Sequence, residues 1–105
     1  MPQFDVHQNP SVAQRNVFPF LAQIQNDQLS IFSTRLVMPL QRLKVVPSAL
    51  PRRLSQTVLI EGENLYLAAH FVAAVHTKML VRPVAGLVGD RSVILDALDA
   101  VVSGG

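Results

Sequence analysis

The sequence predicts a small, mainly β fold that ends in a single α-helix. Short apolar stretches separated by proline, glycine and asparagine recur along the first 87 residues, and this pattern is typical of strands joined by turns. Only the stretch after Asp90 repeats its apolar residues with a helical period. At 105 residues, the chain is expected to form one domain, residues 1–105, around one hydrophobic core.

The first predicted strand is Gln3–His7. Phe4 and Val6 occupy one face of this stretch, and Asp5 and His7 occupy the other. This alternation indicates a strand with one buried face.

Two further apolar stretches, Val17–Gln25 and Leu36–Leu40, are predicted to pair as the central hairpin of a sheet. The turn-forming residues Asn26 and Asp27 follow the first stretch. The second strand is expected to end at Pro39, because proline lacks the amide that a strand ladder requires.

A second hairpin is predicted at Val58–Leu67, where Gly62 can adopt the positive φ that a tight turn requires. A further short strand is predicted within Lys78–Leu87, stopped by Pro83. Between the two hairpins, Gln41–Ser55 carries basic residues and prolines without any acidic residue. It is predicted to be a long surface connection.

The last segment is predicted to be a helix that begins after Asp90, a favourable N-cap residue, and ends at the terminal glycines. Its polar residues form one narrow stripe, namely Ser92, Asp96, Asp99 and Ser103. So wide an apolar arc needs two burial partners. We therefore expect one face to pack on the sheet and another to meet a second copy of the chain. The residues expected at that contact are Ile94, Leu98 and Val101.

The composition also predicts self-association. Half of the residues are hydrophobic and 15% are charged, an apolar share that a small monomer cannot easily bury, so a homodimer is expected. The net charge of +2 is too small to predict direct nucleic-acid binding. No apolar run approaches the roughly 20 residues of a membrane span. The lack of cysteine and of a secretory signal pattern predicts a cytoplasmic protein.

The residues that could carry catalysis are few and poorly spaced. The spacing of His70 and His76 does not place two imidazoles on one face of a helix or strand, and His7 is remote in sequence. Glu61 and Glu63 flank a turn, which favours a solvated tip over paired catalytic carboxylates. We therefore expect no enzymatic activity, no metal and no cofactor.

Six segments are informative when they are taken in chain order. They are "QFDVHQNP", "FPFLAQIQND", "STRLVMPL", "VLIEGE", "AAVHTKML" and a terminal helix with a Ser-Gly ending. In this order the chain resembles the CcdB family of bacterial toxins over nearly its whole length. The resemblance implies a small SH3-like β-barrel with a C-terminal helix that works as a homodimer. It also implies a toxin that enters the cleft of the DNA gyrase A subunits, traps the gyrase–DNA cleavage complex and is relieved by a CcdA-like antitoxin.

The resemblance places gyrase contacts in two regions, the turn after Gln25 and the end of the helix. The residues at those positions are Gln28, Leu29, Asp99, Ser103, Gly104 and Gly105. Ser103 stands where the plasmid toxin of the family has tryptophan, and Gly105 replaces a terminal isoleucine. The tip therefore lacks most of the apolar area that those side chains would bury.

An antitoxin-binding surface is also implied. Arg35 matches an arginine of the family, and further cations could receive an acidic antitoxin tail. These cations are Arg42, Lys44, Arg52 and Arg53. A solvated basic loop is the alternative that the same residues leave open.

Two other functions remain as alternatives. The MazF and Kid ribonuclease toxins share the fold, and Arg82–Val84 is similar to their Arg-Pro-Val strand, but here it lies just before the last helix. A degenerate chromosomal relative that binds antitoxin without poisoning gyrase would agree with the Gly105 ending.

Overall fold

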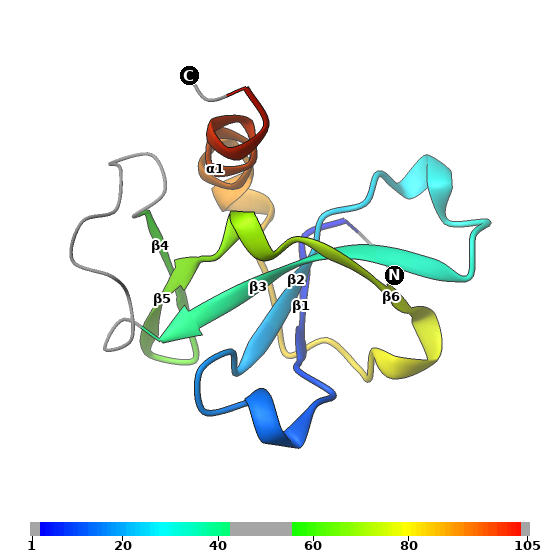
Figure 1. Ribbon diagram of the computed structural model, residues 1–105, viewed down its shortest axis with the longest axis horizontal. Helices are drawn as coiled ribbons and strands as arrows, with labels where there is room; N and C mark the ends of the chain where they lie inside the picture. The colour runs from blue at the N-terminus through cyan, green and yellow to red at the C-terminus, as the bar shows by residue number, and fades with distance from the viewer. Residues whose placement is uncertain (1–2, 43–55, 104–105) are drawn as a thin grey trace.

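The computed structural model describes residues 3–42 and 56–103. It shows a curved sheet that is followed in the chain by a helix (Figure 1). The strands are β1 (Asp5–Gln8), β2 (Phe20–Gln23), β3 (Thr34–Arg42), β4 (Thr57–Ile60), β5 (Glu63–Leu67), β6 (Ala73–His76) and β7 (Ala85–Gly86), and the helix is α1 (Arg91–Ser103). The sheet order is β4-β5-β3-β2-β1-β7, and β6 pairs with β3 off this path. The sheet curls into a nearly closed barrel, which confirms the mainly β class predicted from the sequence.

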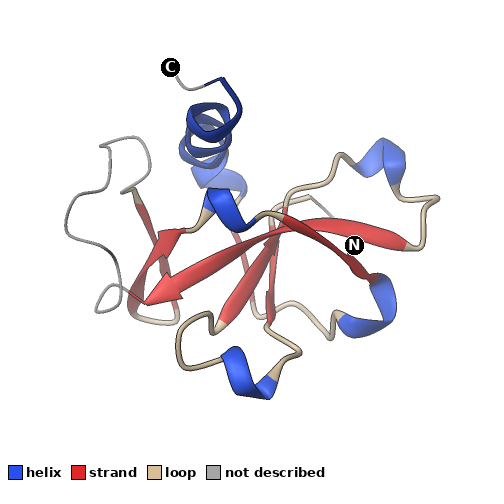
Figure 2. Cartoon of the chain, viewed as in Figure 1, coloured by secondary structure: helices blue, strands red, loops and turns tan. Residues whose placement is uncertain are grey.

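The connections between strands contain short 3-10 helices, which lie around the rim of the sheet (Figure 2). Two of them matter for the surfaces described below, Asp27–Leu29 between β2 and β3, and Thr77–Met79 after β6. The predicted basic connection Gln41–Ser55 lies mostly outside the described residues, apart from its first two, which end β3.

Strand β3 organises the sheet. Along one edge it pairs antiparallel with β2, as the predicted central hairpin requires. Along the other edge it has two partners, because Thr34–Val37 pair with β6 and Leu40–Arg42 pair with β5. Met38 and Pro39 therefore lie where β3 changes partners.

The prediction that Pro39 ends this strand is wrong. Pro39 lies inside β3, opposite Leu21 of β2. Its carbonyl accepts a hydrogen bond from the Ala68 amide at 3.0 Å. In an extended strand, the nitrogen and the carbonyl of one residue point to the same side. The Pro39 nitrogen therefore faces the edge along which β6 and β5 pair, and residue 39 has no ladder partner there. The missing amide therefore costs no ladder hydrogen bond.

The second predicted hairpin is confirmed. Strands β4 and β5 pair with Ile60 opposite Glu63, so the turn consists of Glu61 and Gly62 alone. Both turn residues have positive φ, 51° and 81° respectively, as a two-residue type I′ turn requires. On β4, Val58 and Ile60 are buried while the intervening side chain is exposed, so the turn fixes which face of the hairpin enters the core.

The strand predicted within Lys78–Leu87 is only partly right. Instead of a strand that Pro83 stops, the chain forms a 3-10 helix at Thr77–Met79 and then the short β7 after the proline. The His76 ring nitrogen Nδ1 accepts a hydrogen bond from the Lys78 amide at 3.2 Å and starts this turn. This local cap therefore turns the chain before the apolar residues that follow can pair with another strand.

The core is built from the inward faces of the strands together with α1. The helix begins directly after Asp90, as predicted, and its described residues extend to Ser103. Ile94 and Ala97 are fully buried and join the same cluster as Val6, Met38 and Leu40. Burial of this narrow face holds the helix against the end of the barrel.

The type I′ turn of the second hairpin yields a stability prediction. We expect Glu61→Asn to raise the free energy of unfolding by about 0.5 kcal/mol, because asparagine tolerates positive φ better than glutamate does. We expect Gly62→Ala to lower it by about 1 kcal/mol, because φ is +81° and a Cβ there meets no other atom, so the cost is purely conformational. Urea denaturation of both variants measures the two effects. A Gly62→Ala protein as stable as wild type would contradict the turn geometry.

Candidate protein-interaction surfaces

The loop between β2 and β3 carries the first pair of predicted contact residues. Gln28 and Leu29 lie in the 3-10 helix after Asn26, and both are exposed. The Asn26 side chain accepts a hydrogen bond from the Gln28 amide at 2.9 Å and caps this turn. The exposure of both side chains leaves them available to another protein.

The end of α1 carries the second group. Asp99 and Ser103 are exposed, and the Ser103 hydroxyl donates a hydrogen bond to the Asp99 carbonyl at 2.8 Å. Gly104 and Gly105 lie outside the described residues. Within one copy of the chain, the β2–β3 loop and the end of α1 lie well apart (Figure 1), so the structure does not bring the two predicted gyrase-binding groups together in a monomer.

Arg35 lies in a different setting from the one expected of an antitoxin-binding residue. Its side chain is buried, at 6% exposure. Its guanidinium donates hydrogen bonds to the main-chain carbonyls of Ser30, Phe32 and Thr34. Arg35 therefore holds its own loop, and we correct its assignment for this reason.

The other predicted cations are exposed to different degrees or not described. Arg42 ends β3 and approaches the Glu63 carboxylate at 3.7 Å, with both side chains partly exposed. An ion pair of this kind contributes little stability and can exchange for another partner. Lys44, Arg52 and Arg53 lie outside the described residues.

The predicted dimer-contact residues on α1 divide between two environments. Ile94 is fully buried in the core of its own chain and Leu98 packs partly against it, so Ile94 cannot meet a second copy, and we correct that assignment. Val101 is exposed, at 39%. The most exposed apolar side chains of the helix are Leu95, at 40%, and Val102, at 79%. The apolar residues of the helix are therefore divided between the core and solvent, and the exposed ones include Val101, which was predicted, together with Leu95 and Val102.

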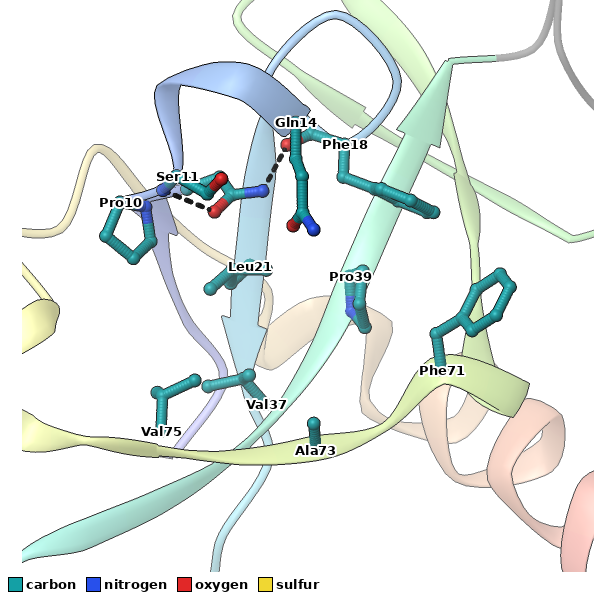
Figure 3. A pocket seen from close by; sticks show the side chains of 11 residues that line it. Pro10, Ser11, Gln14, Phe18, Leu21, Val37, Pro39, Phe71, Ala73 and Val75 are labelled. Carbon is teal, nitrogen blue, oxygen red and sulfur yellow. Dashed lines mark hydrogen bonds between the residues drawn. The ribbon is translucent and has the colours of Figure 1, made fainter.

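A groove of about 450 Å³ opens between the β1–β2 connection, β3 and β6 (Figure 3). The rings of Phe18 and Phe71 meet edge to face across it, with centroids 5.6 Å apart. Its described lining consists of Asn9, Pro10, Ser11, Gln14, Phe18, Leu21, Val37, Pro39, Phe71, Ala73 and Val75. None of these residues is ionisable, and both ends of the Asn9 amide are already hydrogen-bonded to the main chain. The groove can hold apolar groups but offers no acid or base.

The histidines have structural surroundings. The His7 ring is buried and its Nδ1 lies against the Val81 carbonyl. The His70 ring lies against the Phe71 ring, with centroids 4.2 Å apart and the planes tilted by 39°, and His76 caps the 3-10 helix that follows it. Within residues 3–42 and 56–103 there is no cluster of three or more histidine or acidic side chains that could hold a metal ion.

With this geometry described, the family can be stated. The family model described as CcdB protein matches residues 3–104. The chain belongs to the CcdB family. Membership in the CcdB family assigns it to the toxins of toxin–antitoxin pairs. No curated protein matches the chain.

In this CcdB-family chain, none of the described helices has the length and apolar character that a membrane crossing requires. Sequence reasoning missed one surface feature, the exposed apolar pair Ile31 and Phe32 in the β2–β3 loop. The signal was present, because these two residues stand between Ser30 and Ser33 in a segment too polar for a strand.

Tyr66 provides a spectroscopic test of the barrel of this CcdB-family protein. Its side chain is buried and burial raises the pKa of the phenol, whose hydroxyl has no hydrogen-bond partner among the described residues. The folded protein therefore keeps the proton at a pH where the unfolded chain releases it. The contribution of this phenol to the free energy of unfolding should be constant below pH of about 10 and fall above it.

Because the chain has one tyrosine and no tryptophan, ultraviolet absorbance follows this phenol alone. We expect native Tyr66 to titrate at higher pH than in the unfolded chain. Tyr66→Phe should abolish the alkaline fall and leave neutral-pH stability equal or raised by up to about 1 kcal/mol, since it removes an unpaired buried hydroxyl. A marked loss of stability in Tyr66→Phe would reveal a hydrogen bond to the rest of the chain.

Proposed function

We propose that this CcdB-family toxin binds the DNA gyrase A subunit and traps the gyrase–DNA cleavage complex, and that a CcdA-like antitoxin relieves the block. The single observation that carries the proposal is the family match over residues 3–104. The lack of ionisable groups in the described groove supports an action by binding rather than by catalysis. The exposed residues of the β2–β3 loop and of α1 supply surface for such binding.

The proposed gyrase-binding residues follow from the resemblance. They are Gln28, Leu29, Asp99, Ser103, Gly104 and Gly105. The two described groups lie apart in one copy (Figure 1), so a gyrase contact that uses both needs either a wide footprint or two copies. We infer that the toxin acts as a homodimer, which would match the two-fold symmetry of the gyrase A pair.

The proposed dimer contact uses the outer apolar face of α1. Leu95, Val101 and Val102 form its exposed part, and burial of such residues between two copies would remove an apolar surface from water. The proposed antitoxin surface keeps Arg42, Lys44, Arg52 and Arg53. Arg35 leaves this set, because its guanidinium already binds three carbonyls of its own loop.

The dimer is tested by sedimentation velocity at micromolar concentration. We expect twice the chain mass of 11.5 kDa for wild type. Leu95→Asp combined with Val102→Asp should shift the protein to the chain mass, because each aspartate would bury an unpaired charge at the contact. Val12→Asp, at an exposed position outside α1, is the control and should stay dimeric. A monomeric wild type would contradict the dimer, and a dimeric double variant would place it on another surface.

The gyrase proposal is tested by supercoiling and trapped-cleavage assays with wild type, Gly105→Ile and a chain truncated before Ser103. Wild type should inhibit, and Gly105→Ile should inhibit about tenfold more strongly, because one buried isoleucine contributes about 1.5–3 kcal/mol and each 1.4 kcal/mol is a factor of ten. The truncated chain should be weaker than wild type. The dimer mass is checked for each variant.

Two outcomes would revise this proposal. If the truncated dimer poisons gyrase as well as wild type, the tail is not part of the site. If neither wild type nor Gly105→Ile affects gyrase, while wild type still binds a CcdA-like antitoxin, the chain is a degenerate relative that has lost its target. Cleavage of RNA by the purified protein would instead support a MazF-like activity.

A further inference from the structure

His7 differs from the other two histidines of the chain. Its side chain is fully buried, whereas those of His70 and His76 are exposed. Val6, the preceding residue of β1, packs in the barrel core, so the His7 ring lies on the opposite, outer face of the sheet. A segment outside the barrel core must therefore cover this ring.

The segment next to the ring is residues 77–84, which we call the strap. It runs from β6 to β7 and is yellow in Figure 1. The Val81 carbonyl oxygen of the strap lies 2.5 Å from Nδ1 of His7. A carbonyl oxygen can only accept a hydrogen bond, so Nδ1 carries the proton of the neutral ring and donates the bond. His7 therefore latches the strap to the outer face of β1.

Beyond its first turn, the strap is held at few points. Leu80 is its only buried side chain, and residues 81–84 are all exposed. The Val84 amide donates to the Val6 carbonyl at 2.8 Å. Leu80 packs in a small cluster, separate from the barrel core, with Leu21, Val37 and Val75. A segment with so few buried contacts opens locally at a lower free energy than the strands of the barrel.

The second ring nitrogen of His7 makes the latch sensitive to protons. Nε2 is buried and has no hydrogen-bond partner among the residues that the structure describes. A second proton on the ring would bind there and create a charged N–H group without an acceptor. An unpaired charge costs far more free energy inside a protein than in water. The closed strap therefore favours the neutral ring, whereas an open strap lets water solvate the charged one.

The charged groups around His7 offset little of this cost. Within the described chain, no acidic side chain forms an ion pair with the ring. The described residues of β2 and β7 include no ionisable side chain. The ionisable residues of β1, the β1–β2 connection, β6 and the strap are Asp5, Arg15, His76, Lys78 and Arg82. Only Asp5 would attract a charged ring. It shares the outer face of β1 with His7 but stands two residues away, about 7 Å along the strand.

An open strap would change the groove shown in Figure 3. Leu21, Val37 and Val75 line that groove, and the same three residues form the cluster that Leu80 covers. Removal of Leu80 from the cluster would expose the rest of this apolar surface. The groove would then extend along the outer face of the sheet.

We propose that residues 77–84 form a proton-sensitive strap, latched by His7 to the Val81 carbonyl, which opens as the pH falls and extends the apolar groove. The inference does not depend on the proposed function, because every contact that supports it lies within one copy of the chain. It gives the fold a response to acidification that leaves the barrel itself closed.

The first test is amide hydrogen exchange of the full-length protein, followed by NMR at pH 7.5 and pH 5.5 and corrected for the intrinsic pH dependence of exchange. The reporters are the amides of Leu80 and Val84, which donate to the carbonyls of Thr77 and Val6. A free histidine gains most of its proton over this interval, so one proton can favour opening by at most about tenfold. We expect opening at both reporters to rise about three- to tenfold at the lower pH, with exchange in β4 and β5 unchanged.

Two matched variants assign the response to one ring. His7→Asn keeps a donor near the position of Nδ1 but cannot take up a proton, so its strap should open equally at both pH values. His76→Asn is the control. It keeps a side-chain acceptor for the Lys78 amide, as His76 provides, and removes the other histidine next to the strap. It should respond like wild type.

A separate measurement in a chain that retains His7 tests the exposure of the groove. The chain has no cysteine, so the thiol of Val37→Cys reacts alone with iodoacetamide. Its rate is divided by that of Val12→Cys, an exposed position, which removes the effect of pH on thiol reactivity. We expect this ratio to rise about three- to tenfold from pH 7.5 to pH 5.5, in step with the opening of the strap.

Three results would overturn the proposal. The first is a wild-type strap that opens equally at both pH values. The second is a response that survives in His7→Asn or disappears in His76→Asn, because the cap of the 3-10 helix would then be the sensor. The third is faster exchange in β4 and β5 together with the strap, which would show that acid loosens the whole barrel. A constant ratio of thiol reactivities would overturn the extension of the groove.

Discussion

The architecture depends on how one strand shares its edges. β3 pairs with β2 along one edge and with β6 and then β5 along the other, so it joins the two halves of the barrel. Between the β6 and β5 pairings the second edge has no ladder pair, and Pro39 lies there. The same strand carries Arg35, so the partner exchange in β3 and the shape of the β2–β3 loop are set by one continuous element.

Helix α1 packs on the barrel with fewer apolar residues than its sequence suggests. Ile94 and Ala97 enter the core, and the Arg91 guanidinium lies 5.7 Å from the centroid of the Phe4 ring, a distance at which a cation and an aromatic face attract each other. Leu95 and Val102 lie on another side of the helix and remain exposed. Such a helix packs on the barrel through a narrow face and leaves other apolar side chains exposed.

Local signals predicted the parts of the structure that local chemistry determines. The hairpin with Gly62 in its turn and the helix after Asp90 were both evident, because turn geometry and helical period act over a few residues. The predictions for Pro39 and for residues 78–87 were wrong or only partly right. Whether a proline removes a ladder hydrogen bond depends on which edge its nitrogen faces and on which strand lies there. The surfaces were predicted less well. A buried arginine resembles an exposed one in the sequence, and Arg35 is distinguished only by the loop carbonyls that fold around it.

The contacts of Arg35 have an evolutionary consequence. Among the described residues, its three hydrogen bonds all reach main-chain oxygens and none reaches a side chain, so these contacts do not depend on which side chains stand at positions 28–33. Those side chains can be exchanged while the backbone keeps its shape, provided that the substitutions tolerate the same φ and ψ values. The side chains of this loop can therefore change between members of the family without rebuilding the barrel. The same property makes the loop a suitable place to insert randomised sequences for selecting new binders.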